Sequence, residues 1–172
     1  PDNWDQSSVP GSTDDVIIPY LASGNYPIID AGVSADVTVN NVTIGNGASL
    51  DLNGTSQTFA IDGTFSNDGT LILQGDETIT FTNDTNSGTV AYDGTADYTT
   101  TPGNLAAGDA YFNVTFSGTG DWQLGAALDV NGSITLPAAG GSLSSNGFDI
   151  TVGRNWTNTN GTFTASTETV TF

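Results

Sequence analysis

The chain has 172 residues, which is enough for one domain with a substantial core. It carries 19 acidic residues and one basic residue, Arg154, so its formal net charge is −18. This charge repels nucleic acids and anionic membrane surfaces, so neither is an expected partner. The sequence contains no Cys, His, Met or Lys, which excludes disulfides, thiol nucleophiles and Cys-based zinc sites. No apolar run is long enough to span a membrane.

Residues 1–35 differ in pattern from the rest of the chain and are predicted to form a capping segment. Pro10 and Pro19 bracket a short apolar strand at residues 15–18, and a second strand is expected at residues 26–29. Proline cannot donate a hydrogen bond to a strand ladder, which confines both strands to sheet edges or strand ends. We therefore expect this segment to lie on one end of a larger structure.

Residues 36–172 show a regular alternation that predicts many short strands with one face inward. Turn dipeptides such as Asn46-Gly47 and Asp68-Gly69 separate the strands, and residues 95–110 interrupt the rhythm as a loop excursion. No stretch has a helical period, so almost no helix is expected. The alternating apolar pairs are Val37/Val39, Val42/Ile44, Leu50/Leu52, Phe59/Ile61, Leu71/Leu73, Ile79/Phe81, Val90/Tyr92, Val114/Phe116, Trp122/Leu124, Leu128/Val130 and Ile134/Leu136.

One stretch occurs twice, at residues 59–81 and 150–172, with starts 91 residues apart (150 − 59). Phe65 of the first copy corresponds to Trp156 of the second, and the copies close on Glu-Thr-Ile-Thr-Phe and Glu-Thr-Val-Thr-Phe. A long-range repeat of very short strands with Asn and Gly at matching turns favours a parallel β-helix, or β-solenoid, over the alternative of a β-sandwich. Coils of roughly 20 to 25 residues would give about seven coils.

Several strings resemble the lead-in and the repeats of large secreted bacterial surface proteins with adhesin-like parallel β-helices. The lead-in is Asn3-Trp4…Val9-Pro10…Asp14-Asp15-Val16-Ile17-Ile18-Pro19, and the repeat-like strings are Val39–Gly45, Ala48–Gly54, Phe112–Gly120 and Val152–Asn158. The resemblance implies an extracellular, structural or adhesive role and brings no catalytic residues. This chain is much shorter than such proteins usually are.

The chain is not expected to be an enzyme. A Ser or Cys triad needs a His or Lys base, and neither residue is present. Glycoside hydrolysis needs only carboxylates, which keeps it as the third functional hypothesis, with Asp76, Glu77 and Asp84 as candidates. The other interpretation of these three side chains is solvated turn acids.

Calcium is the cofactor that the composition suits best, as a structural or bridging ion. Asp and Asn oxygens at adjacent turns are ligands that Ca²⁺ uses. Asp62, Asp68, Asp76 and Glu77 lie in one region and Asp14-Asp15 in another, but there is no EF-hand loop and no Gly-Gly-x-Gly-x-Asp nonapeptide. A diffuse requirement for cations is therefore expected rather than a defined metal site.

Exposed aromatic residues could form a carbohydrate platform, and Tyr98 in the irregular loop is the best candidate for exposure. Trp122 and Trp156 follow the core-facing rhythm and are predicted to be buried. Arg154 allows two interpretations, an ion pair between subunits or a weak surface pair with Asp149.

Threonine pairs on a flat solenoid face could bind ice, although such pairs are more often the solvent side of a strand. They occur at Thr78-Thr80-Thr82, Thr162-Thr164 and Thr169-Thr171. Seven Asn-x-Ser/Thr sequons matter only if the source modifies them. The sequons start at Asn41, Asn53, Asn83, Asn113, Asn131, Asn155 and Asn160.

The sequence predicts an extracellular or cell-surface structural protein that self-assembles end to end. The last coil is unfinished relative to the first copy of the repeat, so either more protein follows it or a neighbouring copy of the chain completes it. The second option predicts a head-to-tail filament with this chain as its own partner. No Met or signal peptide stands before Pro1, which fits either an excerpt or a processed mature chain, and the second is the preferred interpretation. The alternative is a monomeric carbohydrate-binding or host-adhesion module of a longer surface protein, which would bind a polysaccharide or a cell surface.

Overall fold

The computed structural model describes residues 10–23, 25–30, 36–53, 58–136 and 140–172. Within these ranges the chain forms strands and turns and no helix, and every pair of neighbouring strands is parallel. The predicted parallel β-solenoid is therefore confirmed, and the β-sandwich alternative, which needs antiparallel pairs, is wrong. Asn3, Trp4 and Val9 of the lead-in string lie outside the described residues.

The strands are short, mostly three or four residues. In chain order they are β1 (Asp15–Ile18), β2 (Ile28–Asp30), β3 (Val37–Val39), β4 (Asn41–Ile44), β5 (Ser49–Asn53), β6 (Thr58–Ile61), β7 (Phe65–Asn67), β8 (Thr70–Leu73), β9 (Thr78–Thr80), β10 (Thr89–Tyr92), β11 (Ala110–Tyr111), β12 (Asn113–Phe116), β13 (Asp121–Gln123), β14 (Leu128–Val130), β15 (Ile134–Leu136), β16 (Ser142–Ser144), β17 (Ile150–Val152), β18 (Trp156–Asn158), β19 (Thr162–Thr164) and β20 (Val170–Thr171).

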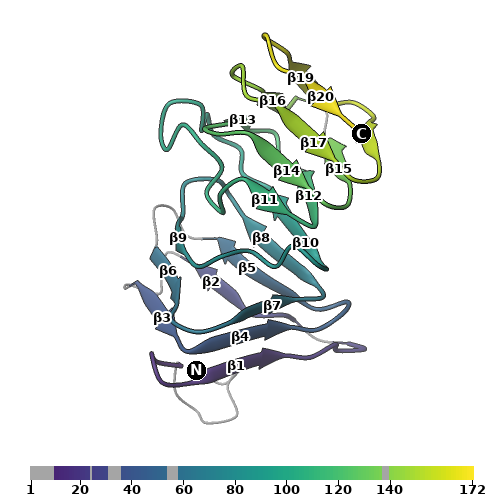
Figure 1. Ribbon diagram of the computed structural model, residues 1–172. Helices are drawn as coiled ribbons and strands as arrows, with labels where there is room; N and C mark the ends of the chain where they lie inside the picture. Colours follow the sequence, from purple (N-terminus) through teal and green to yellow (C-terminus); the bar gives the residue numbers. More distant parts are fainter. Residues whose placement is uncertain (1–9, 24, 31–35, 54–57, 137–139) are drawn as a thin grey trace.

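These strands stack into five sheets that form the walls of the solenoid (Figure 1). Sheet B runs the whole length, in the order β2-β5-β8-β10-β12-β15-β18. Sheet A (β1-β4-β7) and sheet C (β3-β6-β9) complete the N-terminal half. Sheet D (β13-β16-β19) and sheet E (β11-β14-β17-β20) complete the C-terminal half. Strands β1 and β2, from the predicted capping segment, form the first layer of sheets A and B.

Successive turns return to sheet B at intervals within or close to the predicted coil length. Leu52 pairs with Leu73, Leu73 with Tyr92, and Tyr92 with Phe116. The described residues form about six turns, whereas about seven were predicted for the whole chain.

The core is built from columns of inward side chains that repeat one above another in sheet B. One column is Leu50, Leu71, Val90, Val114 and Ile134, each at most 4 % exposed. The predicted alternation is confirmed because each of these residues alternates with an outward one. Stacking of inward positions buries one continuous apolar interior, which supplies most of the stabilisation.

Of the five sheets, A and C end by β9, D and E begin at β11 or later, and only sheet B continues. We call the segment between β9 and β11, residues 81–109, the seam. In the N-terminal half a turn runs through sheets C, A and B, whereas in the C-terminal half it runs through sheets E, B and D. Before the seam, strands β6 and β9 begin two successive turns and pair with each other, with Phe59 opposite Ile79, 20 positions apart (79 − 59). Across the seam, Ile79 and Tyr111 are separated by 32 positions (111 − 79). The extra residues carry the chain one wall further around the axis.

The sequence repeat is one turn of the solenoid, placed on different walls in its two copies. Strands β6, β7, β8 and β9 of the first copy lie in sheets C, A, B and C. The corresponding strands β17, β18, β19 and β20 lie in sheets E, B, D and E. The repeated sequence therefore encodes the shape of a turn and does not determine which sheet each strand joins.

Candidate functional site

The most unusual polar group in the core is the carboxylate of Glu77, in the corner of residues 74–77 between β8 and β9. We call these four residues the acidic corner. Glu77 Oε1 accepts a hydrogen bond from the backbone N–H of Gln74 at 2.6 Å, and Oε2 accepts one from Gly75 at 2.9 Å. The side chain is 4 % exposed. The carboxylate thus closes the turn from inside, as a cap for two backbone donors that would otherwise lack partners.

Burial dominates the electrostatics of the acidic corner. Desolvation raises the pKa of Glu77 to about 7, against the lowering effect of the backbone hydrogen bonds from Gln74 and Gly75, and the neighbouring Asp76 charge raises it further. In the described structure, Asp76 Oδ1 is buried without a hydrogen-bond partner. A carboxyl that titrates near neutral pH is a common property of functional sites, and it is the strongest such signal in the described residues.

Glu168 occupies the same position in the second copy of the repeat (77 + 91) and has a contrasting environment. Its Oε2 accepts hydrogen bonds from the Ser166 backbone N–H and the Ser145 hydroxyl, both at 2.7 Å. These bonds, the Ser145 hydroxyl first, lower the pKa of Glu168. The side chain is partly exposed, in the last turn, whereas Glu77 is covered by the turn above it.

Asp84, the third acid of the glycosidase hypothesis, accepts backbone hydrogen bonds at a different corner from Glu77. Its Oδ2 accepts from the Asn67 backbone N–H at 3.0 Å, and its Oδ1 accepts from Asn86 N–H at 2.9 Å. Asn67 ends β7, the last strand of sheet A, so Asp84 caps the edge of that sheet. Asp84 and Glu77 therefore each serve a separate corner as backbone acceptors.

The acids considered for calcium are also dispersed in the structure. Asp15 Oδ1 accepts from the side-chain amides of Asn40 and Asn41, and Asp14 Oδ2 accepts from Gly11 N–H. Asp62 and Asp68 are exposed. Among the described residues, no three acidic side chains converge on one point as a metal site requires.

Aromatic side chains form a cluster inside the seam rather than a platform on the surface. Tyr98 is 4 % exposed and stacks on Trp122 with ring centroids 5.8 Å apart and planes 14° apart. The prediction of an exposed Tyr98 is therefore wrong, because its loop folds back over the acidic corner and places the ring in the core. The predicted burial of Trp122 is confirmed at 1 % exposure, whereas Trp156 is only partly buried.

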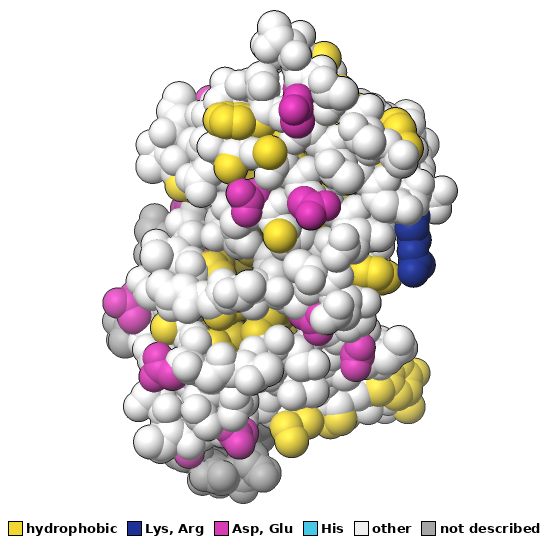
Figure 2. All heavy atoms as spheres, viewed as in Figure 1, with side chains coloured by type: hydrophobic (Ala, Val, Ile, Leu, Met, Phe, Trp, Pro, Cys, Tyr) yellow, Lys and Arg dark blue, Asp and Glu magenta, His cyan; other side chains and the backbone are white. Residues whose placement is uncertain are grey.

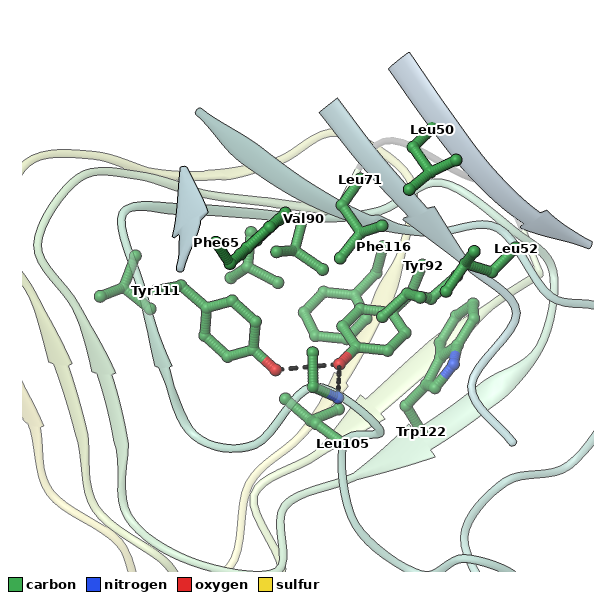
Figure 3. Packing of buried hydrophobic residues seen from close by; sticks show 14 of the residues in the cluster. Leu50, Leu52, Phe65, Leu71, Val90, Tyr92, Leu105, Tyr111, Phe116 and Trp122 are labelled. Carbon is green, nitrogen blue, oxygen red and sulfur yellow. Dashed lines mark hydrogen bonds between the residues drawn. The ribbon is translucent and has the colours of Figure 1, made fainter. Parts of the chain in front are cut away.

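Two tyrosines fasten the excursion to the core, as Figure 3 shows. The hydroxyls of Tyr92 and Tyr111 are 2.9 Å apart, and Tyr92 Oη accepts from the Ala107 N–H at 3.0 Å (Figure 3). Tyr111 Oη donates to the Gly108 carbonyl at 2.6 Å. Burial raises the pKa of both hydroxyls, so they stay protonated. The excursion is thus a packed part of the fold, and its own Leu105 is buried in the core.

Arg154 packs on an aromatic ring rather than pairing with Asp149, and an ion pair between subunits stays a prediction. Its guanidinium carbon lies 5.0 Å from the centroid of the Phe112 ring, in cation–π geometry. The Asp149 carboxylate instead accepts a hydrogen bond from the Thr169 N–H at 2.7 Å. Figure 2 shows the Arg154 side chain on the surface as the one dark blue group.

The predicted threonine pairs fall on three different walls, which leaves no long regular array. Thr78 and Thr80 lie in sheet C, Thr162 and Thr164 in sheet D, and Thr171 in sheet E. The longest run of outward threonines in register among the described residues is in sheet B instead, with Thr115, Thr135 and Thr157.

Several sequon asparagines link one turn to the next. The side-chain amide groups of these residues donate to neighbouring layers: Asn41 to Asp15, Asn83 to the Ala107 carbonyl, Asn113 to the Gly88 carbonyl and Asn131 to the Thr85 carbonyl. Their amide nitrogens therefore already have structural partners.

Two shallow hollows, each of about 420 Å³, flank the seam. The first is lined by the corner after β6 and by residues 80–83, with Phe65 and Phe81 among its lining residues. The second lies between the excursion and residues 124–126. Figure 2 shows a hollow with hydrophobic side chains at its floor between the lower and upper parts of the molecule. Of the three glycosidase candidates, none lines either hollow.

Large apolar side chains are exposed only near the two ends of the described solenoid. These residues are Ile17, Tyr20, Leu21 and Ile28 in the first turn and Phe172 in the last. Ile17 is 72 % exposed and Phe172 is 76 % exposed. The last turn also leaves Trp156, Phe163 and Val170 only partly buried.

Comparisons with models of known protein families, with curated proteins and with solved structures found no significant match. The parallel β-helix implied by the sequence resemblance is present. Within the described residues there is no helix that could span a membrane.

Sequence reasoning missed the role of Glu77 and a second acidic pair. Asp51 and Asp93 both lie on the outer side of sheet B; burial and then the charge of Asp93 raise the pKa of Asp51. The signal for Glu77 was present in the sequence as the acid that opens the closing strand of both repeat copies. Its burial could not be read there, because it depends on the turn stacked above.

Proposed function

We propose that this protein is a structural element of the cell exterior whose solenoids stack end to end, with a second copy of the chain as the partner. The observation that carries the proposal is the distribution of exposed large apolar side chains, which are confined to the first and last turns of the described residues. Contiguous exposed apolar groups are typical of interaction surfaces, whereas the middle turns expose mainly polar groups.

The edges of the sheets support the same arrangement. Among the strands of the described residues, β18, β19 and β20 each have a neighbouring strand on one side only, as do β1, β2 and β3 at the other end. An uncapped parallel edge offers backbone donors and acceptors to another strand. Further residues of a longer chain would extend these edges equally well, and the experiment below separates that possibility from self-association.

The charge of the chain sets the conditions for assembly. A net charge of −18 opposes the approach of two copies, and added salt screens that repulsion. Calcium acts in this proposal as a bridging ion between acidic surfaces, with no requirement for a built site.

Sedimentation velocity and electron microscopy of the purified chain, with and without calcium, test the proposal. We expect particles of uniform width whose length grows with protein concentration, and more so with calcium. The substitutions Ile17→Asp and Phe172→Asp place a charge at either end, on side chains that are 72 % and 76 % exposed, and should abolish growth without unfolding the protein.

Thr119→Asp is the matched control, because it adds the same charge at an exposed position between β12 and β13, away from both ends. This variant should assemble as the unmodified chain does. A chain that stays monomeric at every concentration, with and without calcium, would overturn the proposal and leave the edges to other parts of a longer protein.

A further inference from the structure

The acidic corner contacts aromatic side chains of the seam and of the C-terminal half. Trp122, from β13, donates its indole N–H to the carbonyl of Gln74 at 3.1 Å. Gly75 adopts a φ of +133°, and a Cβ atom there would lie 2.6 Å from Trp122 Nε1 and 3.0 Å from Tyr98 Cγ. The backbone of the corner therefore touches both rings of the stacked pair. A change in the corner is transmitted directly to the contact between the two halves.

The ionised form of Glu77 has little to stabilise it apart from the backbone N–H groups of Gln74, Gly75 and Glu77 itself. The groups that face it are Asp76 in the same corner, the Tyr92 hydroxyl from β10 and the Tyr98 hydroxyl from the excursion, and none of these carries a positive charge. The one basic side chain of the protein, Arg154, lies over Phe112. A negative charge sealed beneath aromatic rings without a cation is costly unless the site opens to water.

We propose that the acidic corner is a proton-controlled joint between the two halves of the solenoid. With Glu77 protonated, the corner stays closed and Trp122 and Tyr98 pack on it. When Glu77 loses its proton, the carboxylate is more stable in contact with water, and transient opening of the corner releases the indole N–H of Trp122. The device makes the rigidity of the solenoid at the seam depend on the pH of its surroundings.

The second copy of the repeat supplies an internal control for this joint. Glu168 accepts the equivalent hydrogen bond from the backbone N–H two residues earlier, that of Ser166, but its side chain is partly exposed. Its ionised form is stabilised rather than penalised, since hydrogen bonding lowers its pKa. The same local motif is therefore sensitive to pH near neutrality at Glu77 and insensitive to it at Glu168.

Hydrogen exchange of the full chain, followed by NMR and corrected for intrinsic exchange rates, tests the joint. The reporters are the backbone amides of Gln74 and Gly75 and the indole N–H of Trp122. Linkage between an open-state pKa of 4.5 and a closed-state pKa of about 7 predicts that their protection falls about 70-fold from about pH 5 to about pH 8.5. Amides of β15 and β16 should keep their protection over this range.

Two substitutions decide whether Glu77 is the responsible group. Glu77→Gln should remove the pH dependence of the three reporters, whereas Glu168→Gln should leave it intact. If Glu77→Gln fails to fold, the carboxyl carbon of Glu77 in the unmodified chain must titrate in step with the loss of protection. Protection that is independent of pH, or a pH dependence that survives Glu77→Gln, would overturn the proposal.

Discussion

The acidic corner and the last turn have the same local sequence pattern but differ in what lies above them. Glu77 and Glu168 each cap a corner by accepting a backbone N–H two residues earlier in the chain. Above Glu77 the excursion and β13 place Tyr98 and Trp122, and the carboxyl becomes a buried acid that titrates near neutral pH. Glu168 stays partly exposed and titrates below its usual range. In a stacked fold the next layer, more than the local sequence, sets the chemistry of a side chain.

The same contrast holds for the two large aromatic residues of the C-terminal half. Trp122 is enclosed between Tyr98, Tyr92 and Phe116, with ring centroids 5.5 to 6.2 Å away. Trp156 makes an edge contact with Phe163 at 4.8 Å and remains partly exposed. Trp122 therefore belongs to the joint, and Trp156 to the end surface of the proposed assembly.

The largest expected effect comes from removing the covering ring. Trp122→Ala should lower the free energy of unfolding by about 3–5 kcal/mol, because it empties a fully buried site and leaves the Gln74 carbonyl without its donor. Trp156→Ala, whose side chain is partly in water, should cost no more than about 2 kcal/mol. Urea denaturation of both variants measures the difference. Equal losses would show that the covering layer does not distinguish the two sites.

The pH dependence of stability should follow from Glu77. Its pKa is raised from 4.5 in the unfolded chain to about 7 in the folded one, so the folded state binds the proton more tightly. The resulting contribution is complete below about pH 4.5 and is lost as the pH rises through about 7, amounting to about 3 kcal/mol.

Denaturation curves of the unmodified chain and of Glu77→Gln, recorded between about pH 4 and pH 8.5, isolate this contribution from that of the other acids. The difference between the two curves should have the stated sign and pH range. A difference that is constant with pH would contradict the raised pKa.

A smaller effect on stability is expected from exchanging the residues that stand two positions before Glu77 and Glu168. This position is Gly75 in the first copy and Ser166 in the second (75 + 91). Gly75→Ser should cost about 2 kcal/mol, since its φ of +133° is strained for a side chain and a Cβ atom would meet Trp122. The reverse change, Ser166→Gly, should alter stability by less than about 1 kcal/mol. Thermal unfolding of both variants would sharpen the comparison.

Features that depend on the local period of the sequence could be predicted. Features that depend on packing between successive turns could not. Alternating pairs such as Leu71/Leu73 predicted inward columns, because the period of two is a property of the strand itself. Tyr98 was predicted to be exposed because its segment has no period, and only the fold-back of the excursion buries it. The contact of Arg154 with Phe112 joins different turns, which no local pattern reveals.

The change of walls at the seam lies between these two cases. The interruption at residues 95–110 was visible in the sequence, and the repeat at residues 150–172 was recognisable as a second turn. The shift of the repeat from sheets C, A and B to sheets E, B and D depends on which strand of the previous turn each strand pairs with. These pairings join strands of successive turns, so the sequence of one turn does not contain them.

The most direct measurement of the central claim is an NMR titration of the side-chain carboxyl carbons of Glu77 and Glu168 in the same sample. The covering layer should give Glu77 a midpoint of about 7 and Glu168 a midpoint below the usual range for a glutamate. Two midpoints that coincide would contradict the claim that the turn above determines the chemistry of the corner.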